Sequence, residues 1–277
     1  MNSIPRRSFL AAGAAGSVVF LTPPPVLRLL AEEENEEGFV ALFDGKTLNG
    51  WHKNKEKIGH GTGGIWRAED GTITGEQDPP GSGNGGILLT DRKFGDFDLR
   101  LEIKPDWGCC SGLFIRSTEK GECLQMMVDY HDAGNVGHIY GEGTGGFNNR
   151  PFNFSGTFND KKKLIGYTTK MEAGSDKLPK AFSIGGKRWC EIYKPDDWNK
   201  VRVLCKGGLY PKITTWINGE KITEFDGATF EHPNYDKGKV AKTLGEKGSI
   251  AVQIHAGGSW PKGAKCRWKN IRIKELE

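Results

Sequence analysis

Short runs in which apolar and polar residues alternate recur from residue 38 to the end of the sequence, and Gly, Asp, Asn or Pro bounds each run. Alternation with a period of two places every second side chain on the same face of an extended strand. No run keeps a helical period over three or more turns. The pattern predicts an all-β fold in which two antiparallel sheets form one sandwich domain over residues 38–277. Typical runs are FDLRLEIK, SGLFIRS, CLQMMVD, KVRVLCK and SIAVQIH.

Two stretches between the runs are long for hairpin loops. They span residues 141–154, which are rich in glycine, and residues 161–189. Long loops in compact domains commonly carry function. We therefore expect these two segments to form walls of a site or to be insertions in the sandwich.

The first 37 residues have the features of an export signal followed by a linker. Arg6 and Arg7 precede an apolar run over residues 9–21, which is the layout of a twin-arginine signal. An uncleaved membrane anchor is the alternative, but this run is shorter than the ~20 apolar residues that a spanning helix needs. We expect a protein of the periplasm or cell envelope that keeps no stable membrane span after the signal is cleaved.

The net charge and the cysteines indicate which partners and which cross-links the protein can have. The formal net charge of +4 gives no electrostatic argument for a nucleic acid partner. Six cysteines could form disulfides outside the cytoplasm, and none has the Cys-x-x-Cys spacing of a structural zinc site. The close spacing of Cys109, Cys110 and Cys123 predicts a disulfide between the strand that starts at Ser111 and the next strand.

Strand parity assigns polar side chains from distant segments to outward-facing surfaces. In CLQMMVD, Gln125 and Asp129 lie on the face opposite the apolar residues, and in SIAVQIHAG the same argument pairs Gln253 with His255. Glu102 lies on the polar face of FDLRLEIK. Planar amide donors and acceptors on such a face suit a ligand rich in hydroxyl groups. The residues predicted to face the core include Leu99, Leu101, Leu124, Met126, Val128, Ile250, Val252 and Ile254.

Several longer motifs carry a resemblance to a known family. They are ALFDGKTLNGW (41–51), SGLFIRS (111–117), GHIYGEGTGGF (137–147), DDWNKVRV (196–203), TWINGEKI (215–222) and AVQIHAGG (251–258). In this order they resemble the 3-keto-disaccharide hydrolase domain family. The resemblance implies a concanavalin A-like jelly-roll sandwich with a carbohydrate site on its concave sheet. It also implies an oligosaccharide or glycoside substrate with a ketone at C3, and a functional link to a sugar 3-oxidoreductase that supplies this ketone.

A ketone at C3 changes the chemistry that a glycoside-cleaving site requires. It acidifies the hydrogen on C2, so that a base can remove this proton while the aglycone leaves from C1, and water can then add to the enone. The site needs a base, a group that stabilises the enolate and an acid for the leaving oxygen. It does not need the paired carboxylates of an ordinary glycosidase, and the sequence lacks the Glu-x-Asp-x-x-Glu run of retaining β-glucanases.

The candidate residues follow from parity, from the motifs and from this chemistry. For Asp129 the alternative is a turn cap, and for Arg116 it is an ion pair with Glu102 or Glu119. A carbohydrate-binding sandwich without catalysis is the alternative function. No cofactor is expected, although Asp, His and Gln side chains could form an oxygen-rich calcium site. The predicted catalytic residues are Asp129, His255 and His131, and the predicted substrate-binding residues are Arg116, Gln125, Gln253, His138, Tyr140, Glu102 and Trp107.

Overall fold

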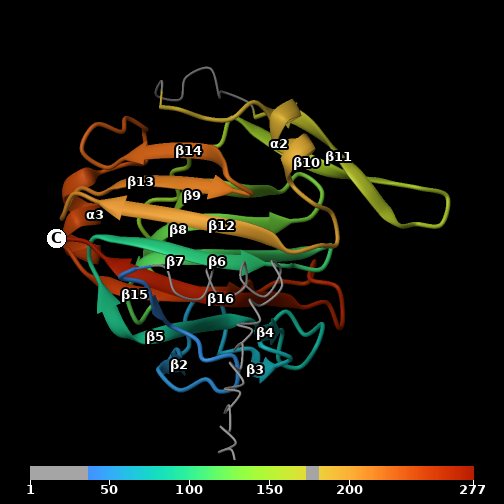
Figure 1. The fold of residues 1–277 in the computed structure, drawn as a ribbon, viewed down its shortest axis with the longest axis horizontal. Coiled ribbons are helices and arrows are strands. Elements are labelled where there is room, and N and C mark those ends of the chain that lie inside the picture. Colours follow the sequence, from blue (N-terminus) through green and yellow to red (C-terminus); the bar gives the residue numbers. More distant parts are fainter. Residues whose placement is uncertain (1–36, 173–180) are drawn as a thin grey trace, which may run out of the picture. The chain divides into compact units, whose positions relative to one another are not determined.

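Two antiparallel β-sheets stack face to face in residues 38–277, which confirms the sandwich predicted from the alternating runs (Figure 1). The computed structural model describes residues 37–172 and 181–277, so the arginine pair and its apolar run lie outside the described residues. The eight-stranded sheet has the order β14 (Glu220–Asp226), β13 (Lys212–Ile217), β12 (Asn199–Lys206), β6 (Phe97–Ile103), β16 (Cys266–Glu275), β4 (Thr72–Glu76) and β3 (Ile65–Glu69), and β1 (Val40–Ala41) pairs with β16.

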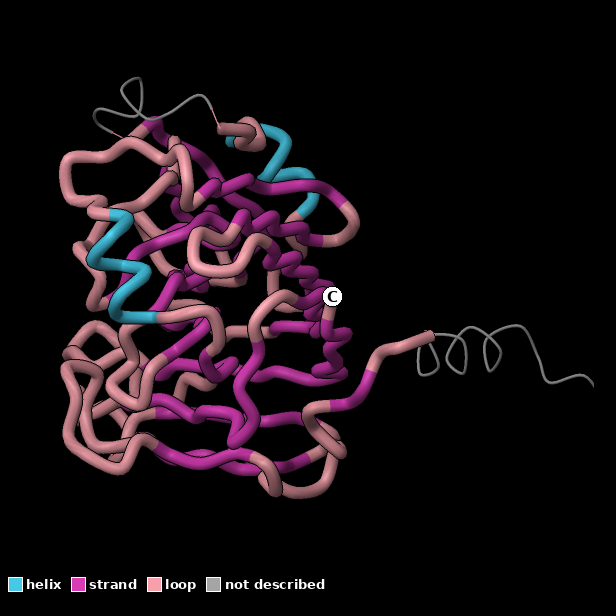
Figure 2. Tube along the Cα trace, turned by 90° about the vertical axis from the view of Figure 1, so that its left-hand side faces the viewer, coloured by secondary structure: helices cyan, strands magenta, loops and turns pink. Residues whose placement is uncertain are grey.

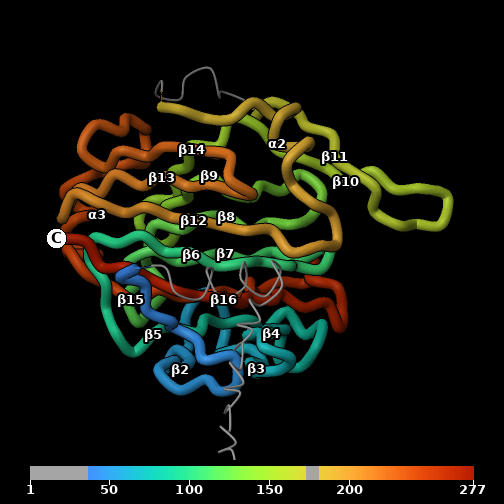
Figure 3. Tube along the Cα trace, viewed as in Figure 1, coloured from blue at the N-terminus to red at the C-terminus, as the bar shows by residue number. Residues whose placement is uncertain are grey.

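The six-stranded sheet carries the strands for which parity predicts polar outer faces. Its order is β2 (Trp51–Lys53), β5 (Gly86–Phe94), β15 (Gly248–Ile254), β7 (Cys109–Ser117), β8 (Cys123–Tyr130) and β9 (Asn135–Glu142). The chain crosses repeatedly between the sheets, for example from β5 to β6 to β7, as in a jelly roll. The colours of Figure 3 show β15, from the C-terminal part of the chain, among strands from the first half.

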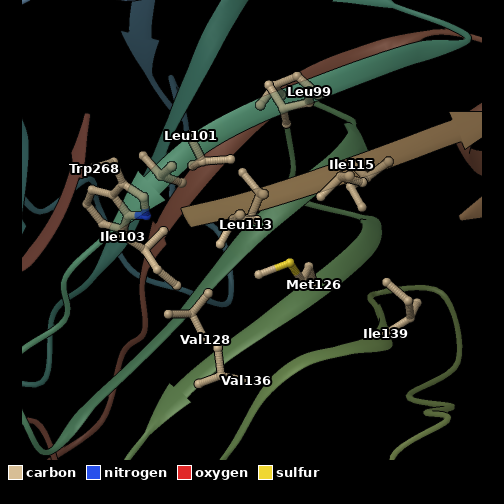
Figure 4. Packing of buried hydrophobic residues seen from close by; sticks show 14 of the residues in the cluster. Leu99, Leu101, Ile103, Leu113, Ile115, Met126, Val128, Val136, Ile139 and Trp268 are labelled. Atoms are coloured by element: carbon tan, nitrogen blue, oxygen red, sulfur yellow. The ribbon is translucent and has the colours of Figure 1, made fainter. Parts of the chain in front are cut away.

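The core lies between the two sheets and is built from the alternate residues that parity predicts. Figure 4 shows Leu99 and Leu101 of β6 opposite Leu113 of β7 and Met126 and Val128 of β8. Each of these five side chains is at most 2% exposed. Burial of one such side chain contributes about 1.5–3 kcal/mol, so the alternation fixes which face of each strand turns inward.

A two-stranded hairpin and two short helices lie outside the main sheets (Figure 2). The hairpin pairs β10 (Phe152–Phe158) with β11 (Leu164–Met171), so part of the predicted long loop over residues 161–189 is a strand. Helix α2 (Gly186–Ile192) packs against this hairpin, and its Trp189 ring stacks on Phe154 at 4.4 Å between centroids. Helix α3 (Lys237–Leu244) begins after Asp236, whose side chain accepts a hydrogen bond from Lys239 N. Within the described ranges, no helix has the length and hydropathy that a membrane span requires.

The register of β7 and β8 decides which of the clustered cysteines can meet. Cys110 lies opposite Asp129, and Ile115 lies opposite Leu124, so Cys123 is at the other end of the strand pair. Six residues along a strand span about 20 Å, whereas a disulfide needs Cα atoms within about 7 Å. The predicted disulfide between these strands is therefore wrong, and all six cysteines are free thiols.

Candidate functional site

An amide chain crosses three strands on the outer face of the six-stranded sheet. Gln125 of β8 donates from Nε2 to the Ser111 carbonyl oxygen at 3.2 Å and to Gln253 Oε1 of β15 at 3.4 Å. It can reach across β7 because Gly112 lies between them, and a Cβ on this glycine would stand 2.3 Å from Gln125 Nε2. The structure thus brings together the two glutamines that parity placed on an outer face.

The series of side-chain hydrogen bonds continues from Gln253 to His60, a residue that was not predicted from the sequence. Gln253 Nε2 lies 2.8 Å from His60 Nδ1. An amide nitrogen can only donate, so Nδ1 accepts and the neutral imidazole carries its proton on Nε2. Burial, with a further contribution from His255, lowers the pKa of His60 to about 4, which keeps the ring neutral near pH 7. Its Nε2 lies 3.6 Å from Glu142 Oε1 at the end of β9.

Two other histidines have the opposite tautomer. His131 Nδ1 lies 2.8 Å from the Asp132 carbonyl oxygen, and His255 Nδ1 contacts the Ala256 carbonyl oxygen. A carbonyl oxygen can only accept, so both rings donate from Nδ1 and keep a basic lone pair on Nε2. The backbone N–H of His255 donates to the Cys110 carbonyl oxygen at 3.2 Å, which places His255 beside β7.

Asp129 lies beside Cys110 and His131. The Cys110 thiol donates to Asp129 Oδ1 over 3.3 Å. Burial raises the pKa of Asp129, and the Cys110 hydrogen bond and the charges of His131 and His255 act in the opposite direction. Burial likewise raises the pKa of Glu142. Asp129 and His131 thus form one group with Cys110, and the His255 ring lies 6.0 Å between centroids from that of His60, which contacts Glu142.

Tyr140 remains on this face, whereas His138 does not. Tyr140 pairs directly with Gln125 across β8 and β9. A β-bulge at Gly137 and His138 then breaks the alternation, because these two residues together oppose Met127. His138 is fully buried, with Nδ1 3.0 Å from Asn135 Oδ1 and Nε2 2.8 Å from Ser183 Oγ. Both ring nitrogens are occupied, so the expectation that His138 contacts a ligand is corrected.

Arg116 and Glu102 also lie outside the cluster. Arg116 is 0% exposed, and its guanidinium donates to the carbonyl oxygens of Gly95 and Gly208 and to Asp96 Oδ1 at 2.9 Å. Glu102 belongs to the eight-stranded sheet, where it accepts from Asn270 Nδ2 at 2.6 Å. Arg116 therefore joins loops to the sandwich, and Glu102 lies on the outer face of the other sheet.

Trp107 belongs to an aromatic cluster beside the β10–β11 hairpin. Its ring meets Tyr130 edge to face at 5.1 Å between centroids and Phe158 at 5.7 Å. Tyr130 is buried in the core. Trp107 thus packs at the base of the hairpin and is partly exposed, and its stacking on a sugar stays a prediction.

Comparisons with known proteins match almost the whole sandwich. The sequence model of the 3-keto-alpha-glucoside-1,2-lyase-like domain matches residues 38–274. A 3-keto-disaccharide hydrolase from Bacteroides thetaiotaomicron is 36% identical over 89 residues, which are 30% of this chain and 29% of that protein, so the match spans less than a third of the relative. The crystal structure of a candidate glycosyl hydrolase from Parabacteroides distasonis ATCC 8503 superposes with a TM-score of 0.50 at 21% identity, covering 86% of this chain and 99% of that chain. This likeness supports the fold.

Proposed function

The chain belongs to the family of 3-keto-alpha-glucoside-1,2-lyase-like domains, and from this membership we propose that it is a carbohydrate-active enzyme that cleaves 3-keto-glycosides. The observation that carries the proposal is the cluster on the outer face of the six-stranded sheet. It combines imidazole nitrogens on His131 and His255 with the partly buried carboxyl groups of Asp129 and Glu142, whose pKa values burial raises. Such a set supplies bases and acids for proton removal next to a ketone.

The proposed roles follow from the protonation of each group. His255 Nε2 removes the C2 proton, and the neighbouring negative charge of Asp129 stabilises the imidazolium that forms. The C1–O bond then breaks, and the leaving oxygen takes a proton from the Glu142 carboxyl group, whose raised pKa suits an acid. His60 offers Nε2–H to a substrate oxygen, and water adds to the enone to complete hydrolysis.

A chromogenic 3-keto-glucoside tests this function directly. We expect the purified protein to release the aglycone, and His255→Ala to lower kcat/KM by about 10²–10⁴-fold because the base is lost. Asp129→Asn should act in the same direction. Glu102→Gln on the other sheet is the matched control and should retain full activity. Glycan binding without aglycone release would contradict the enzymatic proposal and favour a carbohydrate-binding sandwich.

We also propose that the protein is exported through the twin-arginine route. In the cell envelope, an oxidoreductase would supply the 3-keto sugar. The support is the Arg6 and Arg7 pair before the apolar run of residues 9–21. Fusion of residues 1–37 to a reporter that is active only after export tests this. Replacement of both arginines by lysine should abolish reporter activity, and unchanged activity would contradict the route.

A further inference from the structure

We propose that Cys110, Asp129 and His131 bind one divalent transition-metal ion, with Zn²⁺ as the best match to these ligands. One potential ligand atom from each side chain lies within 4.8 Å of the other two. The β7–β8 register places Cys110 directly opposite Asp129, and His131 follows β8 by one residue. Three ligand types that favour the same class of ion therefore converge at one end of a rigid strand pair.

The spacing of the ligand atoms is close to that of a tetrahedral site. Zn²⁺ lies about 2.0–2.3 Å from its ligand atoms, which then stand about 3.3–3.8 Å apart. Cys110 Sγ and Asp129 Oδ1 are already 3.3 Å apart. His131 follows the strand in a loop and is partly exposed, so rotation of its side chain can complete the set.

The hydrogen bond of His131 provides an independent observation that points to a ligand. Histidines that bind metals commonly donate from the second ring nitrogen to a carbonyl or carboxylate, which fixes the ring and its tautomer. His131 donates from Nδ1 to the Asp132 carbonyl oxygen at 2.8 Å, which leaves the Nε2 lone pair available. The ring is therefore already in the tautomer that binds a metal.

Donor chemistry and charge select the ion. Calcium prefers a shell of oxygen atoms, but here sulfur and nitrogen accompany a single carboxylate. The amides of Gln125 and Gln253 are engaged with each other and do not join the set. On binding, the Cys110 thiol releases its proton, so that thiolate and carboxylate together balance the two positive charges of the ion.

Three protein ligands leave one coordination position open, as in catalytic zinc sites. In the proposed reaction an ion there would polarise the substrate ketone, while His255 keeps its free Nε2 as base. This Lewis-acid role rests on the proposed function. The binding of the ion rests only on the three ligands.

Cobalt binding tests the site without any substrate. The purified full chain is stripped with a chelator and titrated with Co²⁺, which reports thiolate ligation through a charge-transfer band in the near ultraviolet. We expect one equivalent to bind with this band, and Zn²⁺ to displace it. Cys110→Ser should abolish the band and weaken binding by more than about 100-fold, because loss of an outer-shell partner alone costs 10–100-fold. Cys190→Ser is the matched control and should leave the band unchanged, since Cys190 lies in α2.

The outcomes separate this proposal from the proposed function. Far-ultraviolet circular dichroism confirms that each variant is folded, and Asp129→Asn should keep the band but weaken Co²⁺ binding at least tenfold. Absence of the band, or a band unchanged in Cys110→Ser, overturns the metal site. Aglycone release by stripped protein that binds no Co²⁺ leaves the proposed function intact, whereas Co²⁺ binding without release leaves only the metal site intact.

Discussion

At the scale of single residues, the histidines of the outer face differ because each has a different neighbour. His60 accepts from an amide nitrogen, whereas His131 and His255 donate to backbone carbonyl oxygens. In their neutral forms one ring therefore donates from Nε2, and two rings accept there. The same residue type therefore supplies hydrogen-bond donors and proton acceptors within one site.

The tautomer of His60 can be reversed through Gln253. A Gln253→Glu carboxylate can only accept, so we expect His60 to donate from Nδ1 and its pKa to rise above the value of about 4 in the parent protein. Long-range ¹⁵N–¹H correlation spectra distinguish the two ring nitrogens, with His60→Gln used for assignment. Gln253→Met removes the donor without adding charge and should leave a tautomer mixture. A parent spectrum with protonated Nδ1 would show that the amide does not fix the ring.

At the scale of strands, the sequence predicts which way side chains point better than which strands are neighbours. Parity correctly pairs Gln125 with Asp129 and Gln253 with His255, because both strands bury apolar residues on their other face. It does not reveal that β6 belongs to the other sheet, because alternation carries no information on pairing partners. The placement of Glu102 therefore required the structure.

Bulges and loops limit sequence prediction in a different way. The bulge in β9 turns His138 inward, although simple alternation pairs it with Tyr140. Arg116 is held by Gly95, Asp96 and Gly208, which are far from it in sequence. His60 lies in a loop without a motif. By contrast, Glu142 could have been found by extending the Tyr140 parity by two residues.

We expect that a side chain added at Gly112 in β7 would disturb Gln125. A Cβ there would lie 2.3 Å from Gln125 Nε2 and 2.6 Å from Gln125 Cδ. Gly112→Val should therefore displace Gln125, break its hydrogen bond to Gln253 and lower kcat/KM, with about 1–3 kcal/mol lost in the free energy of unfolding from overpacking. Gly166→Ala in β11 is the matched control, because no atom lies within 4 Å of its added Cβ.

Urea unfolding and the chromogenic assay together check the Gly112 prediction. We expect the control to match the parent protein in both measurements. A Gly112→Val protein with unchanged kcat/KM would show that the amide chain across β7 is not needed for positioning. Loss of activity in both glycine variants would point to a general effect of strand substitution instead.

At the scale of the whole molecule, two histidines are buried in their neutral form at different places in the sandwich. His60 contacts Gln253 on the outer face of the six-stranded sheet, and His138 in β9 contacts Asn135 of the same strand and Ser183 outside it. Burial lowers the pKa of His60 to about 4 and that of His138 to about 3, the latter with a contribution from Arg150. Both values are below the 6.5 of an unfolded chain, so folding is coupled to proton release.

This coupling predicts that acid destabilises the fold well above the usual range of carboxylate titration. As the pH falls below 6.5, the unfolded chain takes up protons at both positions while the native histidines stay neutral, so the free energy of unfolding decreases. From pH 7 to pH 5 each histidine should cost about 2 kcal/mol. The raised pKa values of Asp129 and Glu142 affect stability in the opposite direction, because these carboxyl groups take up protons in the native state first.

The contribution of His138 is therefore measured as the difference in pH dependence between the parent protein and a variant without this histidine. Urea unfolding of the parent protein and His138→Gln at pH 7 and pH 5 should show a pH dependence that is about 2 kcal/mol smaller in the variant, and equal dependences would mean that His138 is protonated in the native state.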